Sequence, residues 1–281
     1  MKTTWKKMVV LGSLMVVLVG LLGACQDKNK AGNKGEAKDQ WSEIKKKKEV
    51  VMGLDDTFVP MGFKNKQGEI VGFDVDLAKA VFKLYGITVK TQPIDWSMKE
   101  KELTNGTIDL IWNGYSATPQ RRKKVAFSQT YMKNEQILVT PKSSGINQLD
   151  KMTGKILGAQ NGSSGYDIFV QEEEVLKNKV KDQEAVLYDT FNEGFIDLEA
   201  GRIDGLLIDK VYANYYLAKK DQLNDYYLIG NIYQPEDFAV GIRKSDKELQ
   251  TKLNEGFEQL EKDGSFAKIS DKWFGEDVSP K

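Results

Sequence analysis

The chain has 281 residues, 40% of them hydrophobic and 29% charged, and its 41 basic residues balance its 41 acidic ones. This balance excludes a dedicated nucleic-acid binder and a disordered charged tail, and the apolar content is enough to bury the core of one large domain or of two ordinary ones. The sequence contains no histidine and a single cysteine, Cys25. Histidine-dependent triads, histidine-ligated zinc, internal disulfides and paired-cysteine metal sites are therefore excluded, and we expect neither a metal nor a cofactor.

The first 25 residues have the pattern of an export signal. Three lysines precede an apolar run at residues 8–22, which is shorter than the roughly 20 residues that span a bilayer as a helix. The run ends in small residues directly before Cys25. This arrangement resembles a bacterial lipoprotein signal, in which residues 1–24 are removed and the cysteine receives lipid, such as palmitate. We predict a protein anchored by lipid on the extracytoplasmic face of the cell membrane; the alternative is an uncleaved anchor with an incidental cysteine.

After the cysteine comes a segment without large apolar side chains, QDKNKAGNKGEAKDQ, which cannot form a core of its own. We predict that residues 25–40 form a flexible tether that carries the lipid, and that folding begins near Trp41.

From there, short apolar strands alternate with amphipathic helices. Strands are predicted at 49–54, 87–91 and 108–112, with helices at 75–85 and 98–104 between them, and the same alternation of strands and helices recurs from Lys155 to Ile208. Asp74 and Gly86 are the predicted start and stop of the helix at 75–85. This order favours an α/β fold with mainly parallel sheets.

Two segments echo each other: LTNGTIDLIWN at 103–113 and LEAGRIDGLLID at 198–209. Each has a helix end, a glycine, Ile-Asp and an apolar strand, and each strand ends in a polar residue, Asn113 or Asp209. Since ligands of open α/β sheets bind beyond the carboxyl ends of strands, the echo indicates two lobes that face one cleft. The alternative is that the pattern is common punctuation between a helix and a strand.

The segment NGYSATPQRRKKVAF at 113–127 contains a candidate anion site. Thr118 before Pro119 predicts a helix start, which places Arg121 in the first turn, where a cation opposes the helix dipole. A bound carboxylate would explain an arginine there, because a guanidinium donates two parallel hydrogen bonds to it. The alternative is a solvated basic run.

A second candidate is GAQNGSSGYDIF at 158–169, in which a strand leads through Gly162, Ser163, Ser164 and Gly165 into a helix. Glycine allows close backbone approach, and free N–H groups at a helix start favour an anion. The segment lacks the Gly-Lys-Ser/Thr ending of a phosphate-binding loop. The alternative is an ordinary turn with a serine cap.

Two further groups of residues follow strands. Asp209 can pair with an ammonium group, or it can simply cap the helix that follows. The loop at 53–60 offers Asp55, Asp56 and Phe58, and Trp96 begins a helix at another strand end. Aromatic rings in such loops can stack on a ligand or hold a cation. The alternative for Phe58 and Trp96 is core packing.

Taken together, these segments resemble a known family. The matching stretches are GLDDTFVPMGFKNKQGEIVGFDVDLAKAVF, IDLIWNGYSATPQRRKKVAFS, GKILGAQNGSSG, AGRIDGLLID and KISDKWFGED. They are similar to the family 3 solute-binding proteins of amino-acid ABC importers, which have the type II periplasmic-binding fold, over residues 45–277. The resemblance implies a clamshell with one lobe from 41–132 and 239–281 and the other from 133–238. We expect the two crossings between the lobes near 131–135 and 236–240.

The resemblance also implies roles for single residues. Arg121 matches the arginine that clamps the α-carboxylate of an amino acid, Ser164 matches a donor to it from the other lobe, and Asp209 matches the acceptor of the α-ammonium. Further residues complete the expected site: Gly114, Ser116 and Ser163 beside the charged ends, and Asp55, Phe58 and Trp96 around the side chain. Asn113 and Gln160 lie at site positions where the residue departs from those seen in some family members.

The resulting expectation is an amino-acid import receptor that delivers its ligand to a permease and, through it, to ATPase subunits. If Asp55, Asp56 and Glu135 make the distal pocket acidic, and Phe58 and Trp96 sandwich the side chain, the ligand is polar or cationic. Arginine is our first expectation and glutamine the second. The alternatives are an enzyme on the same fold, such as a lyase similar to cyclohexadienyl dehydratase, and a sensor domain; a secondary adhesion role also stays open.

Overall fold

The computed structural model describes residues 38–280. The predicted signal peptide, Cys25 and most of the predicted tether lie outside the described residues. The last residues assigned to the tether belong to the folded domain: the Asp39 carboxylate accepts a hydrogen bond from the backbone N–H of Glu248 at 2.6 Å, and the Gln40 N–H donates to Asp246 at 3.3 Å. None of the helices described has both the length and the apolar character needed to cross a membrane.

The first lobe is built on a five-stranded sheet with the order β5-β1-β6-β13-β7. Its strands are β1 (Glu49–Leu54), β5 (Thr88–Pro93), β6 (Leu110–Ile111), β7 (Ala126–Asn134) and β13 (Glu236–Ile242). β1 pairs in parallel with β5 and β6, and β13 runs antiparallel to β6 and β7.

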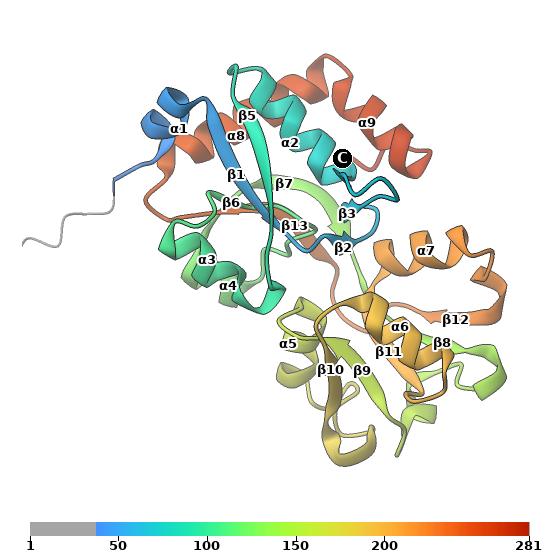
Figure 1. Cartoon of the computed structure of the whole chain (residues 1–281). Coiled ribbons are helices and arrows are strands. Elements are labelled where there is room, and N and C mark those ends of the chain that lie inside the picture. Colours follow the sequence, from blue (N-terminus) through green and yellow to red (C-terminus); the bar gives the residue numbers. More distant parts are fainter. Residues whose placement is uncertain (1–37, 281) are drawn as a thin grey trace, which may run out of the picture. The chain divides into compact units, whose positions relative to one another are not determined.

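Helices from both ends of the chain cover this sheet. They are α1 (Trp41–Lys47), α2 (Phe73–Lys83), α3 (Lys99–Asn105), α4 (Pro119–Lys124), α8 (Lys247–Lys262) and α9 (Ser265–Phe274). The helices α2, α8 and α9 contact one another, so the C-terminal segment completes the first lobe (Figure 1).

The second lobe repeats this plan with the strand order β10-β9-β11-β8-β12. Its strands are β8 (Gln136–Pro141), β9 (Leu157–Gln160), β10 (Ala185–Tyr188), β11 (Gly205–Asp209) and β12 (Tyr226–Ile229), and its helices are α5 (Ser164–Gln171), α6 (Phe191–Glu199) and α7 (Lys210–Lys219). β9 pairs in parallel with β10 and β11, whereas β8 is antiparallel to β11 and β12. In both sheets a single strand runs against the other four, which agrees with the predicted fold class.

Smaller elements lie between these strands and helices. A three-stranded sheet follows β1 and consists of β2 (Thr57–Phe58), β3 (Gly62–Lys64) and β4 (Ile70–Val71). Short 3-10 turns include η1 (Trp96–Met98), η2 (Lys142–Ser144), η3 (Leu149–Met152), η4 (Lys181–Gln183) and η5 (Leu223–Asp225).

The sequence echo corresponds to equivalent units of the two lobes. Gly106 and Gly201 both have the left-handed backbone conformation that ends a helix, with φ of 80° and 68°, and each precedes a buried strand, β6 or β11. Asn113 follows β6, and Asp209 is the last residue of β11. Both polar residues thus lie at the carboxyl end of their strand. The two segments therefore form the same helix-to-strand connection in the two lobes.

The main correction to the predicted elements concerns Asp74. The helix α2 begins at Phe73 with Gly72 at its N-cap, so Asp74 lies inside the first turn and does not cap it. Its side chain is fully buried, and its Oδ2 accepts hydrogen bonds from the backbone N–H of Gly114 at 2.7 Å and from the Tyr131 hydroxyl at 2.9 Å. The Asp74 carboxylate thus holds the loop after β6 in place through its hydrogen bond to Gly114.

The strand predicted at 49–54 is confirmed as β1, and the other predicted elements are displaced by a few residues. The strands predicted at 87–91 and 108–112 are β5 and β6, and the strand expected from Lys155 is β9, which begins at Leu157. The helix predicted at 98–104 starts as a 3-10 turn at Trp96, since the Asp95 side chain accepts the N–H of Ser97, and continues as α3.

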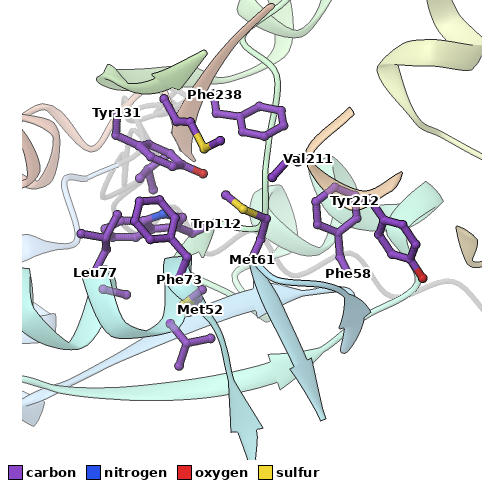
Figure 2. Packing of buried hydrophobic residues seen from close by; sticks show 14 of the residues in the cluster. Met52, Phe58, Met61, Phe73, Leu77, Trp112, Tyr131, Val211, Tyr212 and Phe238 are labelled. Carbon is purple, nitrogen blue, oxygen red and sulfur yellow. The ribbon is translucent and has the colours of Figure 1, made fainter. Parts of the chain in front are cut away.

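Aromatic side chains fill the core beneath the site (Figure 2). The rings of Tyr131 and Phe257 stack at 5.7 Å, and Trp112 packs against both, at 5.9 and 5.3 Å. Figure 2 also shows Phe58 of the first lobe beside Tyr212 of the second, with 5.5 Å between the ring centroids. Aromatic rings therefore pack within the first lobe and also join it to the second.

The buried Asp74 predicts an unusual pH dependence of stability. Burial raises the pKa of Asp74 to about 7. Because the folded-state pKa lies above the unfolded value, this group contributes stability that is complete below about pH 4 and is lost as the pH rises through about 7. Asp74→Asn imitates the protonated form and should remove this slope, whereas Asp74→Ala should lower the free energy of unfolding by about 1–3 kcal/mol at pH 4, where Asp74 is protonated, and by less at pH 8. Circular dichroism melts from pH 4 to 8 measure both, and equal slopes in wild type and Asp74→Asn would contradict the assignment.

Candidate functional site

Polar side chains from both lobes meet where strands of the two sheets end. Asp55 follows β1 and Asn113 follows β6 in the first lobe, while Gln160 ends β9 and Asp209 ends β11 in the second. All four side chains are buried. Direct hydrogen bonds join the lobes here, so the residues form one site and not two separate edges.

Arg121 lies at the centre of the first lobe's contribution. As predicted, Thr118 caps α4: its hydroxyl accepts the Arg121 N–H at 3.3 Å, with Pro119 at the first helical position. The Arg121 side chain is buried under the second lobe, while the three basic residues that follow it are exposed, so a solvated basic run does not describe it. Its guanidinium lies 4.7 Å from the Tyr115 ring and donates to the carbonyl oxygens of Ser116 and, across the lobes, Gly162, both at 3.1 Å.

The turn from Gly162 to Gly165 faces Arg121 from the second lobe. Ser163 caps α5 by accepting the Tyr166 N–H at 3.0 Å, as its capping interpretation predicts, whereas the Ser164 hydroxyl lies 3.0 Å from that of Ser116. Gly162 has a φ of 71°, and a Cβ atom there would come within 2.9 Å of the Ser97 Cα. The lobes approach so closely at this point that only glycine fits.

Asp209 occupies the N-cap position of α7, but its side chain does not cap the helix. Its Oδ1 instead accepts hydrogen bonds from the side-chain amides of Asn134 at 2.6 Å and Gln136 at 2.8 Å. Burial, and after it the charge of Glu236, raise the pKa of Asp209 well above its usual range, while Arg121 acts in the opposite direction. A cation brought to this carboxylate would therefore be strongly favoured.

Asp55 and Gln160 form a polar contact between the lobes. The Gln160 side chain donates to Asp55 Oδ2 at 2.9 Å and to the Asp189 carbonyl oxygen at 2.9 Å. Asn113 accepts the Asp55 backbone N–H at 3.1 Å, and burial raises the pKa of the Asp55 carboxyl. A carboxylate of one lobe and an amide of the other thus form a direct hydrogen bond here.

Phe58 and Gly114 pack closely together near the contact between Asp55 and Gln160. The Phe58 ring packs on Phe191 and Tyr212 of the second lobe, with ring centroids at 5.8 and 5.5 Å. Gly114 has a φ of 59°, and a Cβ atom there would collide with Phe58 at 2.9 Å and Phe238 at 3.2 Å. Gly114 is thus required for the close fit of Phe58 over the loop.

The predicted acidic distal pocket is wrong in two of its three residues. Asp56 points away and pairs with Lys64 at 2.9 Å. Glu135 lies at the crossing between β7 and β8, where it pairs with Lys210 at 3.0 Å and accepts the N–H of Asn231. Of this set Asp55 alone shares a contact with the other site residues, through Gln160 and Asn113.

Trp96 belongs to a different aromatic group from Phe58. Its ring meets the edge of Tyr115 at 5.9 Å in the core of the first lobe, as the core-packing alternative states. Phe58 and Trp96 therefore do not face each other as the two sides of a sandwich.

The sequence analysis did not identify several polar residues that contact the predicted site residues. Lys99 is 2% exposed and donates to the carbonyl oxygens of Trp96 at 3.0 Å and Gly162 at 2.8 Å, and burial together with Arg121 lowers its pKa to about 7. Gln136 is a fully buried polar residue that begins the apolar strand β8, a contrast that could have identified it. Glu236 looks like an ordinary strand start in sequence.

Comparison with known proteins identifies the family to which the chain belongs. Residues 50–276 match the family model of bacterial extracellular solute-binding proteins, family 3. The chain is 30% identical to the L-cystine-binding protein TcyJ of Escherichia coli, covering 85% of this chain and 87% of that one. It is 32% identical to the arginine-binding extracellular protein ArtP of Bacillus subtilis, covering 81% and 87%.

A solved structure is similar throughout the folded part. It is an ABC uptake transporter substrate-binding protein of Streptococcus pneumoniae with bound histidine, 61% identical with a TM-score of 0.86, and the match covers 86% of this chain and 99% of that one. With the two α/β lobes and the polar site between them, these matches place the chain in family 3 of the bacterial extracellular solute-binding proteins, the amino-acid receptors of ABC importers.

Proposed function

We propose that this chain binds a free cationic or polar L-amino acid between its lobes and delivers it to the permease of an ABC importer, without catalysing a reaction. The observation that carries the proposal is the pair of opposite charges at one site, Arg121 from the first lobe and Asp209 from the second. The relatives named above are binding proteins, which favours this role over the lyase alternative.

An amino acid is a zwitterion, and each of its charged ends requires a partner when it leaves water. Arg121 offers a guanidinium to the carboxylate, and the Ser164 hydroxyl, which lies 3.0 Å from that of Ser116, is a further donor from the second lobe. Asp209 offers a carboxylate to the ammonium. Because the two charges come from different lobes, a ligand that binds both favours the arrangement in which the lobes are in contact.

Histidine and arginine are the ligands that we place first, with glutamine after them. Asp55 can accept from an imidazolium or guanidinium, and Gln160 can bind an amide or a ring nitrogen. Sequence analysis favoured arginine. Histidine now stands beside it because the similar Streptococcus pneumoniae protein was solved with histidine, while ArtP binds arginine.

Arg121→Ala should weaken binding of the best ligand by at least about a hundredfold, because it leaves a desolvated carboxylate without its partner. Isothermal titration calorimetry measures the change. Arg122→Ala is the matched control, since the neighbouring arginine is exposed and its Nε donates to the Ala117 carbonyl oxygen outside the site. Near-normal affinity of Arg121→Ala would remove this residue from the site.

The identity of the ligand is tested by titrating the protein with each of the twenty common amino acids. We expect binding of histidine, arginine or glutamine, and Asp55→Asn should weaken binding of the cationic ligands by roughly tenfold more than that of glutamine. Asp56→Asn, which alters the adjacent carboxylate that faces Lys64, should leave this preference unchanged. A protein that binds only small or branched apolar amino acids would disprove the proposed specificity.

We further propose that the chain is held by lipid at Cys25 on the extracytoplasmic face of the membrane. Cys25→Ser removes the predicted site of lipid attachment, so it should abolish incorporation of labelled palmitate. It should also release the protein from the membrane fraction, because stable anchoring needs more than one acyl chain. Cell fractionation and mass spectrometry of the N-terminal peptide measure both effects. Retention of Cys25→Ser in the membrane would support the uncleaved-anchor alternative.

A further inference from the structure

Glu236 collects hydrogen-bond donors from both lobes on a single oxygen. It is the first residue of β13, the strand by which the chain returns to the first lobe. Its Oε2 lies 2.9 Å from the hydroxyl of Ser116 in the first lobe, and 3.0 Å from both the hydroxyl of Ser164 and the amide nitrogen of Gln136 in the second. A carboxylate with this set of partners belongs to the site and not to the solvated surface.

Glu236 is also directly linked to Asp209. The amide nitrogen of Gln136 lies 2.8 Å from Asp209 Oδ1 and 3.0 Å from Glu236 Oε2, and the amide of Asn134 joins the same two oxygens at 2.6 and 3.4 Å. Two carboxylates that share two neutral amides repel each other, here with Asp209 buried and Glu236 half-buried. The charge of Glu236 is one cause of the raised pKa of Asp209. Such a pair is stabilised by a cation that reaches both groups.

Arg121 forms its contacts with groups other than Glu236. In the part of the chain that the structure describes, Arg121 donates to two carbonyl oxygens, and the carboxylate in ion-pair range is that of Asp167 at 3.8 Å. Glu236 instead lies with Asp209, on the side of the site that is rich in negative charge.

We propose that Glu236 is a second carboxylate of the ammonium-binding site, so that the α-ammonium of the ligand binds to Glu236 and Asp209 together. This inference rests on the proposed function. An ammonium group has three N–H donors, and Asp209, Glu236 and the Ser116 hydroxyl oxygen supply three acceptors. When the Ser116 hydroxyl donates to Glu236, its lone pairs are left for the ligand. The site then selects compounds with a free, charged α-amino group.

The test compares Glu236→Gln, which keeps the size of the side chain, with Asp237→Asn, the adjacent carboxylate that pairs with Lys133. Calorimetric titrations use L-histidine, L-arginine and their desamino analogues 3-(imidazol-4-yl)propionate and 5-guanidinopentanoate. Glu236→Gln should weaken amino-acid binding by roughly tenfold or more, and Asp237→Asn by less than about twofold. The affinity for the desamino analogues should change little in Glu236→Gln, because they carry no ammonium group.

Three results would overturn the inference: unchanged or tighter amino-acid binding by Glu236→Gln, an equal loss for the desamino analogues, or a complex in which Glu236 lies beyond hydrogen-bond distance of the ligand nitrogen. The crystal structure of the amino-acid complex decides the matter if the analogues bind too weakly to titrate. Failure of the proposed function is a separate outcome, since the wild-type protein would then bind none of the amino acids.

Discussion

Arg121 and Asp209 carry opposite charges in a place where most water is excluded, and each must be stabilised by groups that the fold brings to it. Arg121 is held by carbonyl oxygens from both lobes and by the ring of Tyr115, and Asp209 by two side-chain amides. Under the proposed function, a ligand that carries both opposite charges would offset the cost of burying these groups.

Local signals predicted the elements that position the site. Thr118 and Pro119 define the start of α4 by themselves, because a cap requires only residues three positions apart. Glycines 106 and 201 likewise end helices through their own backbone conformation. The order of strands and helices, and with it the α/β class, could be read from such neighbours in sequence.

The partners of buried polar groups could not be predicted in this way. Asp74 has a favourable place for a helix cap in the sequence, yet its partners are 40 and 57 residues away. Glu236 binds groups that are 72, 100 and 120 residues distant. Asp56 and Glu135 were assigned to the pocket by charge alone, whereas the direction of each side chain is set by the strand or crossing that carries it.

Asn134 and Glu236 face each other in register at the ends of β7 and β13, the two strands from which the chain passes to the other lobe. Any rotation of one lobe against the other must go through these strands. A side chain at this place lies at the connection about which the lobes would rotate. A contact between it and a ligand would therefore act directly on that connection. At Glu236 the proposed contact with a ligand and the mechanics of lobe movement therefore depend on one residue.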